Sequence, residues 1–144
     1  MVIEERTIGD RELTVLLDAA HAELVSRYGP GRSQVKEGAR YLVASVDGQA
    51  VGCGAVQHVD AVTGELKRMY VTPGHRGRGI ARSLLTALED LARGLGYERL
   101  RLATGLRQPE AIALYEKCAY TPTEPYGRYV DAPLTRCYQK VLAQ

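Results

Sequence analysis

The residues best suited to chemistry in this sequence are the glycines and basic side chains of one short segment. Gly74, Gly77 and Gly79 have no Cβ, so a ligand can approach the backbone closely at three positions. Residues 66–88 contain no acidic side chain, although helices usually begin with acidic residues. The basic side chains gathered here are His75, Arg76, Arg78 and Arg82. Together these features are typical of an anion-binding turn.

The turn lies between a predicted strand and a predicted helix. Thr63–Val71 is rich in strand-forming residues and is stopped by Pro73 and Gly74. Apolar residues then recur at helical spacing and predict an amphipathic helix over Gly79–Arg93. Basic charges at a helix N-terminus are unfavourable by about 0.3–1 kcal/mol each, unless an anion is bound there. The sequence therefore predicts an anion site at this helix start, with a solvated basic turn as the alternative.

Two common nucleotide motifs do not fit this turn. The P-loop requires Lys and Ser or Thr where the sequence has Ile80 and Ala81. The dinucleotide fingerprint requires a third glycine where the sequence has Arg82. It also requires an acidic residue at the end of the next strand, whereas Glu98 lies at the start of that strand. The expected ligand is therefore neither a nucleoside triphosphate nor a dinucleotide.

The segment resembles the pyrophosphate loop of the GNAT superfamily of acyl-CoA-dependent N-acyltransferases. The family pattern (Q/R)-x-x-G-x-(G/A) is matched by Arg76, Gly79 and Ala81. The stretch QPEAIALYEKCAY, residues 108–120, is similar to the later family motif N-x-x-A-x-x-x-Y-x-x-x-G-(F/Y). Gln108 replaces the Asn of that motif, and Ala119 replaces a glycine, so the end of that helix is expected to differ. The tail EPYGRYVDAPLTRCYQK also resembles family members, so the resemblance covers nearly the whole chain.

The resemblance implies a fold and a cofactor. The expected fold is the α/β (α+β) GNAT fold, a mixed, mostly antiparallel sheet of about six to seven strands with helices on both faces. The order read from the sequence is β-α-β-β-β-α-β-α-β, in a single domain over residues 1–144. The cofactor is acetyl-CoA, a co-substrate, and no metal is expected. The implied cofactor-binding residues are Met69, Tyr70, Val71, Arg76, Gly77, Arg78, Gly79, Ala81, Arg82 and Gln108.

The resemblance also implies the catalytic groups. A backbone N–H at Tyr70–Val71 would stabilise the oxyanion, and Tyr115 would protonate the departing thiolate as general acid. A phenol with a pKa near 10 is protonated at neutral pH. Glu65 is the candidate base, and on a regular strand it would share a face with Val71. Glu65 can equally bind the substrate ammonium or pair with Lys67, and Tyr115 can equally be a core residue.

Composition narrows the setting of this chemistry. The chain has 144 residues and a net charge of +2, so it does not indicate nucleic-acid or membrane binding as a whole. Cys53, Cys118 and Cys137 are far apart and indicate neither a zinc site nor a disulfide framework. Cys53 and His21 are interpreted as packing residues. The expected location is cytoplasmic, since no signal peptide or long apolar segment is present.

The expected function is an N-acetyltransferase that moves an acetyl group from acetyl-CoA to a primary amine of a small molecule or peptide by direct attack. A catalytically silent acyl-CoA-binding module and a nucleic-acid binder are the alternatives, and a homodimer is possible. A loop over residues 28–38 is long enough to form part of a pocket wall. Four acidic residues would favour cationic amines if they lined that pocket: Glu37, Glu110, Glu124 and Asp131.

Overall fold

The computed structural model describes residues 1–31 and 34–142. Its strands are β1 (Val2–Arg6), β2 (Arg40–Val46), β3 (Gln49–His58), β4 (Thr63–Val71), β5 (Arg99–Gly105), β6 (Thr121–Thr123) and β7 (Thr135–Val141). Its helices are α1 (Arg11–Tyr28), α2 (Ile80–Gly94) and α3 (Pro109–Lys117), with short 3₁₀ turns η1 (Pro73–His75) and η2 (Gly127–Tyr129). None of the helices in the described ranges has the length and apolar character that crossing a membrane requires.

The seven strands form one sheet in the order β1-β2-β3-β4-β5-β7-β6. Among the strands of the described ranges, only β4 and β5 are parallel, and the other neighbours are antiparallel. This is the predicted mixed, mostly antiparallel sheet, and the predicted element order is confirmed except for β6. Pro122 occupies the middle of β6, and proline is compatible with an edge strand, which is where β6 lies.

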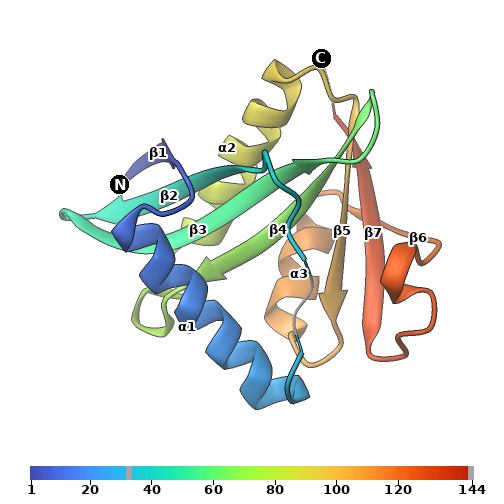
Figure 1. Ribbon diagram of the computed structural model, residues 1–144, viewed down its shortest axis with the longest axis horizontal. Helices are drawn as coiled ribbons and strands as arrows, with labels where there is room; N and C mark the ends of the chain where they lie inside the picture. Colours follow the sequence, from blue (N-terminus) through green and yellow to red (C-terminus); the bar gives the residue numbers. More distant parts are fainter. Residues whose placement is uncertain (32–33, 143–144) are drawn as a thin grey trace.

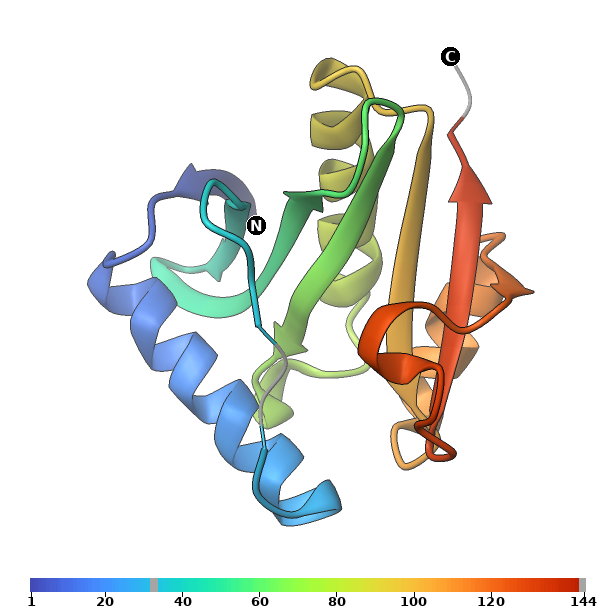
Figure 2. The same cartoon turned by 45° about the vertical axis from the view of Figure 1, so that its right-hand side comes forward.

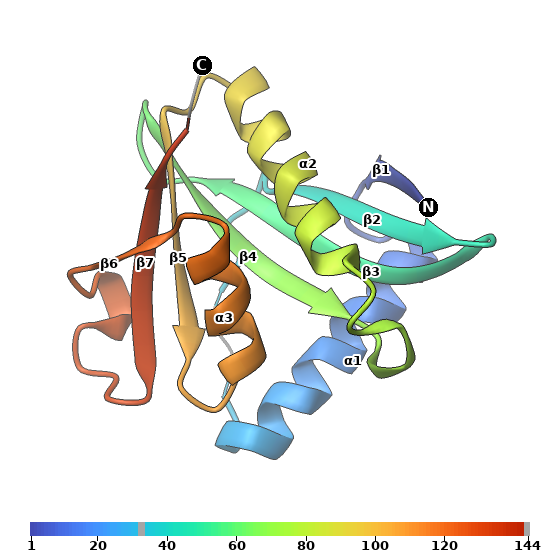
Figure 3. The same ribbon diagram turned by 180° about the vertical axis from the view of Figure 1, so that it is seen from behind.

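Helices cover both faces of the sheet, as predicted (Figures 1 and 3). On one face α1 packs Leu13, Leu16 and Leu17 against Val43 and Cys53 of the sheet. We call this the α1 face. On the other face α2 and α3 cover a larger apolar cluster, which includes Leu84, Leu88, Leu100, Leu102 and Tyr138. We call this the α2–α3 face. Asp10 caps the start of α1, because its side chain accepts a hydrogen bond from the Leu13 amide at 3.0 Å.

A β-bulge interrupts the pairing of β3 with β4. Cys53 pairs with Tyr70 and Ala55 pairs with Lys67, so Gly54 lies opposite two residues, Arg68 and Met69. Arg68 has φ 60°, the left-handed conformation that bulges often use. A Cβ on Gly54 would lie 2.6 Å from the sulfur of Met69, which explains the glycine. The atoms nearest to Gly54 thus belong to side chains, and the glycine lies in the bulge itself.

The bulge overturns one expectation about β4. Glu65 and Val71 were expected to share a face, because six residues separate them on a regular strand. Val71 and Leu66 instead belong to the same cluster on the α2–α3 face, so Glu65 points to the α1 face. The extra residue at Arg68 shifts the alternation between them. The expectation that Glu65 and Val71 share a face of β4 is therefore wrong.

The end of α3 keeps the backbone conformation that a glycine would provide. Ala119 has φ 71°, so it adopts the left-handed conformation in which glycine normally ends such a helix. The expectation that Ala119 changes this helix end is wrong. The alanine accepts a strained conformation that costs about 1–2 kcal/mol in an L-residue.

The strands β4 and β5 diverge along their length. They are paired only from Thr63 with Arg99 to Glu65 with Arg101. Beyond this point β4 continues to Val71 and β5 continues to Gly105 without pairing to each other (Figure 2). The space that opens between them leads from one face of the sheet to the other.

Candidate active site

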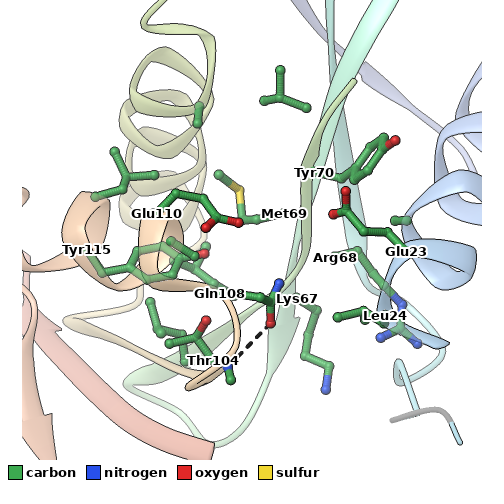
Figure 4. Close-up of a pocket in the computed structure, with 18 of the residues that line it drawn as sticks. Glu23, Leu24, Lys67, Arg68, Met69, Tyr70, Thr104, Gln108, Glu110 and Tyr115 are labelled. Atoms are coloured by element: carbon green, nitrogen blue, oxygen red, sulfur yellow. Dashed lines mark hydrogen bonds between the residues drawn. The ribbon is translucent and has the colours of Figure 1, made fainter. Parts of the chain in front are cut away.

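A cavity of about 920 Å³ lies where β4 and β5 diverge. Its walls come from the C-terminal half of α1, from β4, from the start of α2, and from β5 and α3 (Figure 4). The loop predicted to form a pocket wall contributes Gly29, Pro30 and Gly31, while Arg32 and Ser33 lie outside the described residues. The cavity brings together the basic turn, Glu65, Gln108 and Tyr115, which are far apart in the sequence.

The N-terminus of α2 offers free backbone donors to this cavity. Gly79 is the N-cap residue with φ 79° and has no side chain to cap the helix. The first intrahelical bond runs from the Ser83 amide to the Gly79 carbonyl at 3.0 Å, so the amides of Ile80, Ala81 and Arg82 have no acceptor within the helix. The first turn contains no acidic residue. The backbone and the dipole therefore both favour an anion at this position.

The three arginines of the turn do not have the same surroundings. Arg76 donates from Nε to the Val71 carbonyl at 2.8 Å and from Nη2 to the Glu23 carboxylate at 2.7 Å. Its guanidinium carbon also lies 5.5 Å from the centroid of the Tyr70 ring. Arg78 and Arg82 are exposed and have no carboxylate partner among the described residues. Arg76 therefore fixes the end of β4 to α1. The positive charges of Arg78 and Arg82 lie at the N-terminus of α2 without a carboxylate among the described residues beside them.

Tyr115 extends from α3 into the cavity (Figure 4). Its ring packs edge-on against Tyr120 with 5.7 Å between centroids, so the core fixes its orientation. Within the described part of the chain, no hydrogen-bond partner for its hydroxyl is found. Burial raises the pKa of Tyr115, so the phenol keeps its proton well above neutral pH. A protonated donor without a protein acceptor thus faces the cavity.

Gln108 joins α3 to the end of α1. Its Oε1 is 3.4 Å from the Gly105 amide and 3.5 Å from the Tyr28 hydroxyl, so both donors approach one oxygen. The Tyr28 hydroxyl also accepts a bond from the Arg107 amide at 2.9 Å. A Cβ on Gly105 would overlap this tyrosine, which explains the glycine there. The carbonyl end of Gln108 is therefore engaged, and its amide nitrogen remains to donate into the cavity.

Glu65 is buried and lies between cations. One carboxylate oxygen is 3.2 Å from both Nε and Nη2 of Arg101, and the other is 3.8 Å from Nζ of Lys67. The Lys67 ammonium in turn donates to the Tyr129 hydroxyl at 3.2 Å. Pairing with Lys67 was one of the roles that the sequence left open for Glu65. Arg101 was not anticipated, because it lies on a different strand, 36 residues further along the chain.

Two other sequence expectations concern residues near the site. Cys53 is fully buried, and burial raises the pKa of its thiol to about 12, so it is a packing residue as predicted. His21 lines the cavity and is half-buried. Of the four acidic residues expected to attract cationic amines, only Glu110 lines the cavity, and it pairs with Arg27 at 2.9 Å. The other three are Glu37, Glu124 and Asp131, which do not line it.

Metal ligands are not clustered in the described ranges. No group of three or more His, Cys, Asp or Glu side chains is placed there to hold a metal ion.

Comparison with known proteins agrees with this geometry. Residues 11–120 match the family model described as Acetyltransferase (GNAT) family. An IAA acetyltransferase of Azospirillum brasilense is 43% identical over 104 residues, which are 72% of this chain and 68% of that protein. A crystal structure from Klebsiella pneumoniae, assigned as an acyl-CoA N-acyltransferase, has a TM-score of 0.85 and 33% identity, covering 99% of this chain and 97% of its own.

A more distant structure shows the same fold with a ligand. The GNAT acetyltransferase of Elizabethkingia anophelis, crystallised with acetyl-CoA bound, has a TM-score of 0.75 and 21% identity. The alignment covers 98% of this chain and 97% of that one. At this identity the likeness concerns the arrangement of strands and helices.

Proposed function

Because this chain belongs to the GNAT acetyltransferase family, we propose that it transfers an acetyl group from acetyl-CoA to a primary amine of a small molecule or peptide by direct attack. The observation that carries the proposal is one cavity with an anion-binding helix N-terminus at one end and an unpartnered, protonated phenol in its wall. Bound acetyl-CoA supplies an activated thioester. The protein supplies the groups that bind the cofactor, orient the thioester and protonate the departing thiolate.

The diphosphate of acetyl-CoA fits the start of α2. The free amides of Ile80, Ala81 and Arg82 point at this position, and Gly77 and Gly79 leave the backbone accessible. Arg78 and Arg82 add two positive charges that no described carboxylate neutralises. We propose that the Gln108 amide nitrogen donates to the pantetheine arm further along the cavity, since its carbonyl oxygen is already engaged. The strand end from Met69 to Val71 would form the other wall along this arm.

The end of β4 is proposed to stabilise the oxyanion. Successive backbone N–H groups of a strand point in opposite directions. At Tyr70 and Val71 one N–H therefore faces β3, and the other faces the side where β5 has diverged. A preorganised donor of this kind contributes about 2.7–4 kcal/mol to an acyl-transfer barrier. Arg76 holds the strand end in place through the Val71 carbonyl, which makes it a positioning residue.

The proton balance assigns a role to Tyr115. Attack of the neutral amine forms the new C–N bond, the C–S bond breaks, and the nitrogen loses one proton while the sulfur gains one. Tyr115, a protonated phenol in the wall without a protein acceptor among the described residues, is proposed to provide the proton to sulfur. Glu65 is proposed as a positioning residue for Lys67 and Arg101, since its two carboxylate oxygens already face these two cations.

The transferase activity is tested with a panel of amines. We expect purified protein and acetyl-CoA to release CoA only when a suitable amine is present, with an equal amount of N-acetylated amine formed. The panel includes amino acids, polyamines, aminoglycosides and peptides, and product is identified by mass spectrometry. Binding of acetyl-CoA without any transfer across the panel would favour a catalytically silent binding module.

The charge at the start of α2 gives a separate prediction for the cofactor site. Arg82→Gln keeps the aliphatic stem and the helix propensity but removes one positive charge from the first turn. We expect the melting temperature without ligand to stay the same or rise slightly, because the removed charge opposes the helix dipole. The stabilisation by acetyl-CoA should decrease, since only the bound state uses this charge.

Paired melting curves with and without acetyl-CoA measure both effects, at low and at moderate salt. The difference between mutant and wild type should shrink as salt increases. A lower melting temperature of the free mutant together with an unchanged ligand-induced shift would make Arg82 a structural residue and would contradict this assignment.

A further inference from the structure

The half of the cavity on the α1 face is rich in positive charge. We call it the acceptor half, and it lies between β4, the C-terminal part of α1 and η2. Its lining includes two carboxylates, Glu23 and Glu65, and four cations. These cations are Lys67, Arg68, Arg76 and Arg128. His21, also in this half, adds no negative charge in either protonation state.

Both carboxylates of the acceptor half already face cations. Glu23 is 2.7 Å from Arg76 and 3.8 Å from Arg27. Glu65 is 3.2 Å from Arg101 and 3.8 Å from Lys67. Arg101 comes from outside the lining and adds to the positive excess, whereas Arg27 is paired with Glu110 of α3. The excess of cationic over carboxylate side chains does not depend on the hydrogen bonds that the lining cations make, because hydrogen bonds to neutral groups leave their charge unchanged.

No acidic side chain is missing from this count. The residues outside the described ranges are Arg32, Ser33, Ala143 and Gln144, and none has a carboxylate side chain. Glu110, the other acidic residue of the lining, belongs to α3 and pairs with Arg27 at 2.9 Å. The acceptor half therefore offers an incoming ammonium group no carboxylate without a cation beside it.

The segment that carries Arg128 is held against the sheet by aromatic contacts. The Arg101 guanidinium lies 3.8 Å from the centroid of the Tyr126 ring, and Tyr126 packs edge-on against Tyr129 at 5.5 Å. Tyr129 accepts the hydrogen bond from Lys67 at 3.2 Å. These contacts place η2 on the α1 side of the sheet, opposite α3 (Figure 2). Arg128 is thus presented at the edge of the cavity by a fixed segment.

From this charge distribution we infer that the acetyl acceptor is an amine that also carries an anionic group, a carboxylate or a phosphate. The inference rests on the proposed acetyl transfer and names its substrate class. Arg68 and Arg128 have the planar donor geometry that suits either oxyanion. Positive surroundings also lower the pKa of a bound ammonium, so they favour the neutral amine that attacks. Polyamines and aminoglycosides would be poor acceptors for the same reason.

The test uses amines of similar length that differ in the distal group. The probes are 4-aminobutanoate, 3-aminopropylphosphonate, butylamine and 1,4-diaminobutane, each assayed for kcat/KM with acetyl-CoA. We expect an anionic probe to exceed butylamine by about tenfold or more, and the diamine to be slowest. The faster of the two anionic probes identifies the oxyanion as carboxylate or phosphate.

A charge reversal provides the internal control. Arg128→Glu should lower the preference for the anionic probe over the diamine by about tenfold, while the affinity for acetyl-CoA stays unchanged. Arg11→Glu makes the same change at the exposed start of α1, away from the cavity lining, and should leave the preference as in wild type. Equal kcat/KM for anionic probe and diamine, or no effect of Arg128→Glu on their ratio, would overturn the inference.

Failure of the inference is distinguishable from failure of the proposed function. Transfer to all four probes at similar rates keeps the function and rejects the charged acceptor. If no probe is acetylated, calorimetry with the CoA-saturated protein still tests the inference. Binding of an anionic probe that Arg128→Glu abolishes would support it, and absence of such binding would reject it.

Discussion

Replacing Tyr115 by Phe should lower kcat by about 10²- to 10⁴-fold and leave the affinity for acetyl-CoA nearly unchanged. The phenol has no hydrogen-bond partner among the described residues, so its loss disrupts no contact of the free protein. The proton matters only when the thiolate leaves. The measurement is kcat under conditions where chemistry limits the rate, together with calorimetry of acetyl-CoA binding.

The pH dependence of kcat provides a second test of the role of Tyr115. Burial raises the pKa of Tyr115, so its protonated, active form persists to a higher pH than that of a free tyrosine. We therefore expect no fall in the wild-type rate from ionisation of this phenol up to about pH 10. Tyr97→Phe is the matched control, because this hydroxyl bonds to His58 and lies outside the cavity lining. An unchanged kcat in Tyr115→Phe would leave Tyr115 with a packing role only.

Gly79→Ala should weaken acetyl-CoA binding by at least about tenfold, equivalent to 1.4 kcal/mol. A Cβ at this position has no protein atom within 4 Å, so it would project into the open space at the start of α2. In our assignment the diphosphate occupies that space. Calorimetric titration of the variant with acetyl-CoA measures the loss.

A substitution at a second glycine controls for the backbone strain that Gly79→Ala introduces. Gly79 has φ 79° and Gly96, beyond the other end of α2, has φ 91°, and neither has a protein atom near an added Cβ. Gly96→Ala therefore introduces comparable strain and a comparable loss of stability. It should retain the affinity of wild type. Wild-type affinity in Gly79→Ala, or an equal loss in Gly96→Ala, would contradict the placement of the diphosphate.

Features that depend on neighbouring residues could be predicted from the sequence. The leucine spacing after Gly79 and the glycines and arginines before it define α2 and its unusual start, because they act within a few residues of each other. Asp47-Gly48 between two apolar segments is typical of the tight hairpin turn that joins β2 and β3, and both residues have positive φ, 51° and 79°. The remaining order of elements followed from similar local patterns and from the family resemblance.

Features that depend on distant contacts could not be predicted in this way. The bulge at Arg68 reverses the direction of Glu65 relative to Val71, and no residue type in β4 identifies it. Glu23 neutralises Arg76 across 53 positions of the chain, and Arg101 reaches Glu65 from a neighbouring strand. The positive acceptor half arises from β4, η2 and their packing. Its charge is opposite to that expected from the acidic residues in the sequence.

The central claim, direct transfer of the acetyl group to an amine, is tested most directly by following a labelled acetyl group through a single turnover. Protein in excess over isotopically labelled acetyl-CoA is mixed with an accepted amine and quenched at successive times. We predict that label leaves acetyl-CoA only when the amine is present and enters the N-acetylated amine at the rate of CoA release, without passing through the protein. Label on the protein itself, or hydrolysis to acetate in place of the amide, would contradict the account.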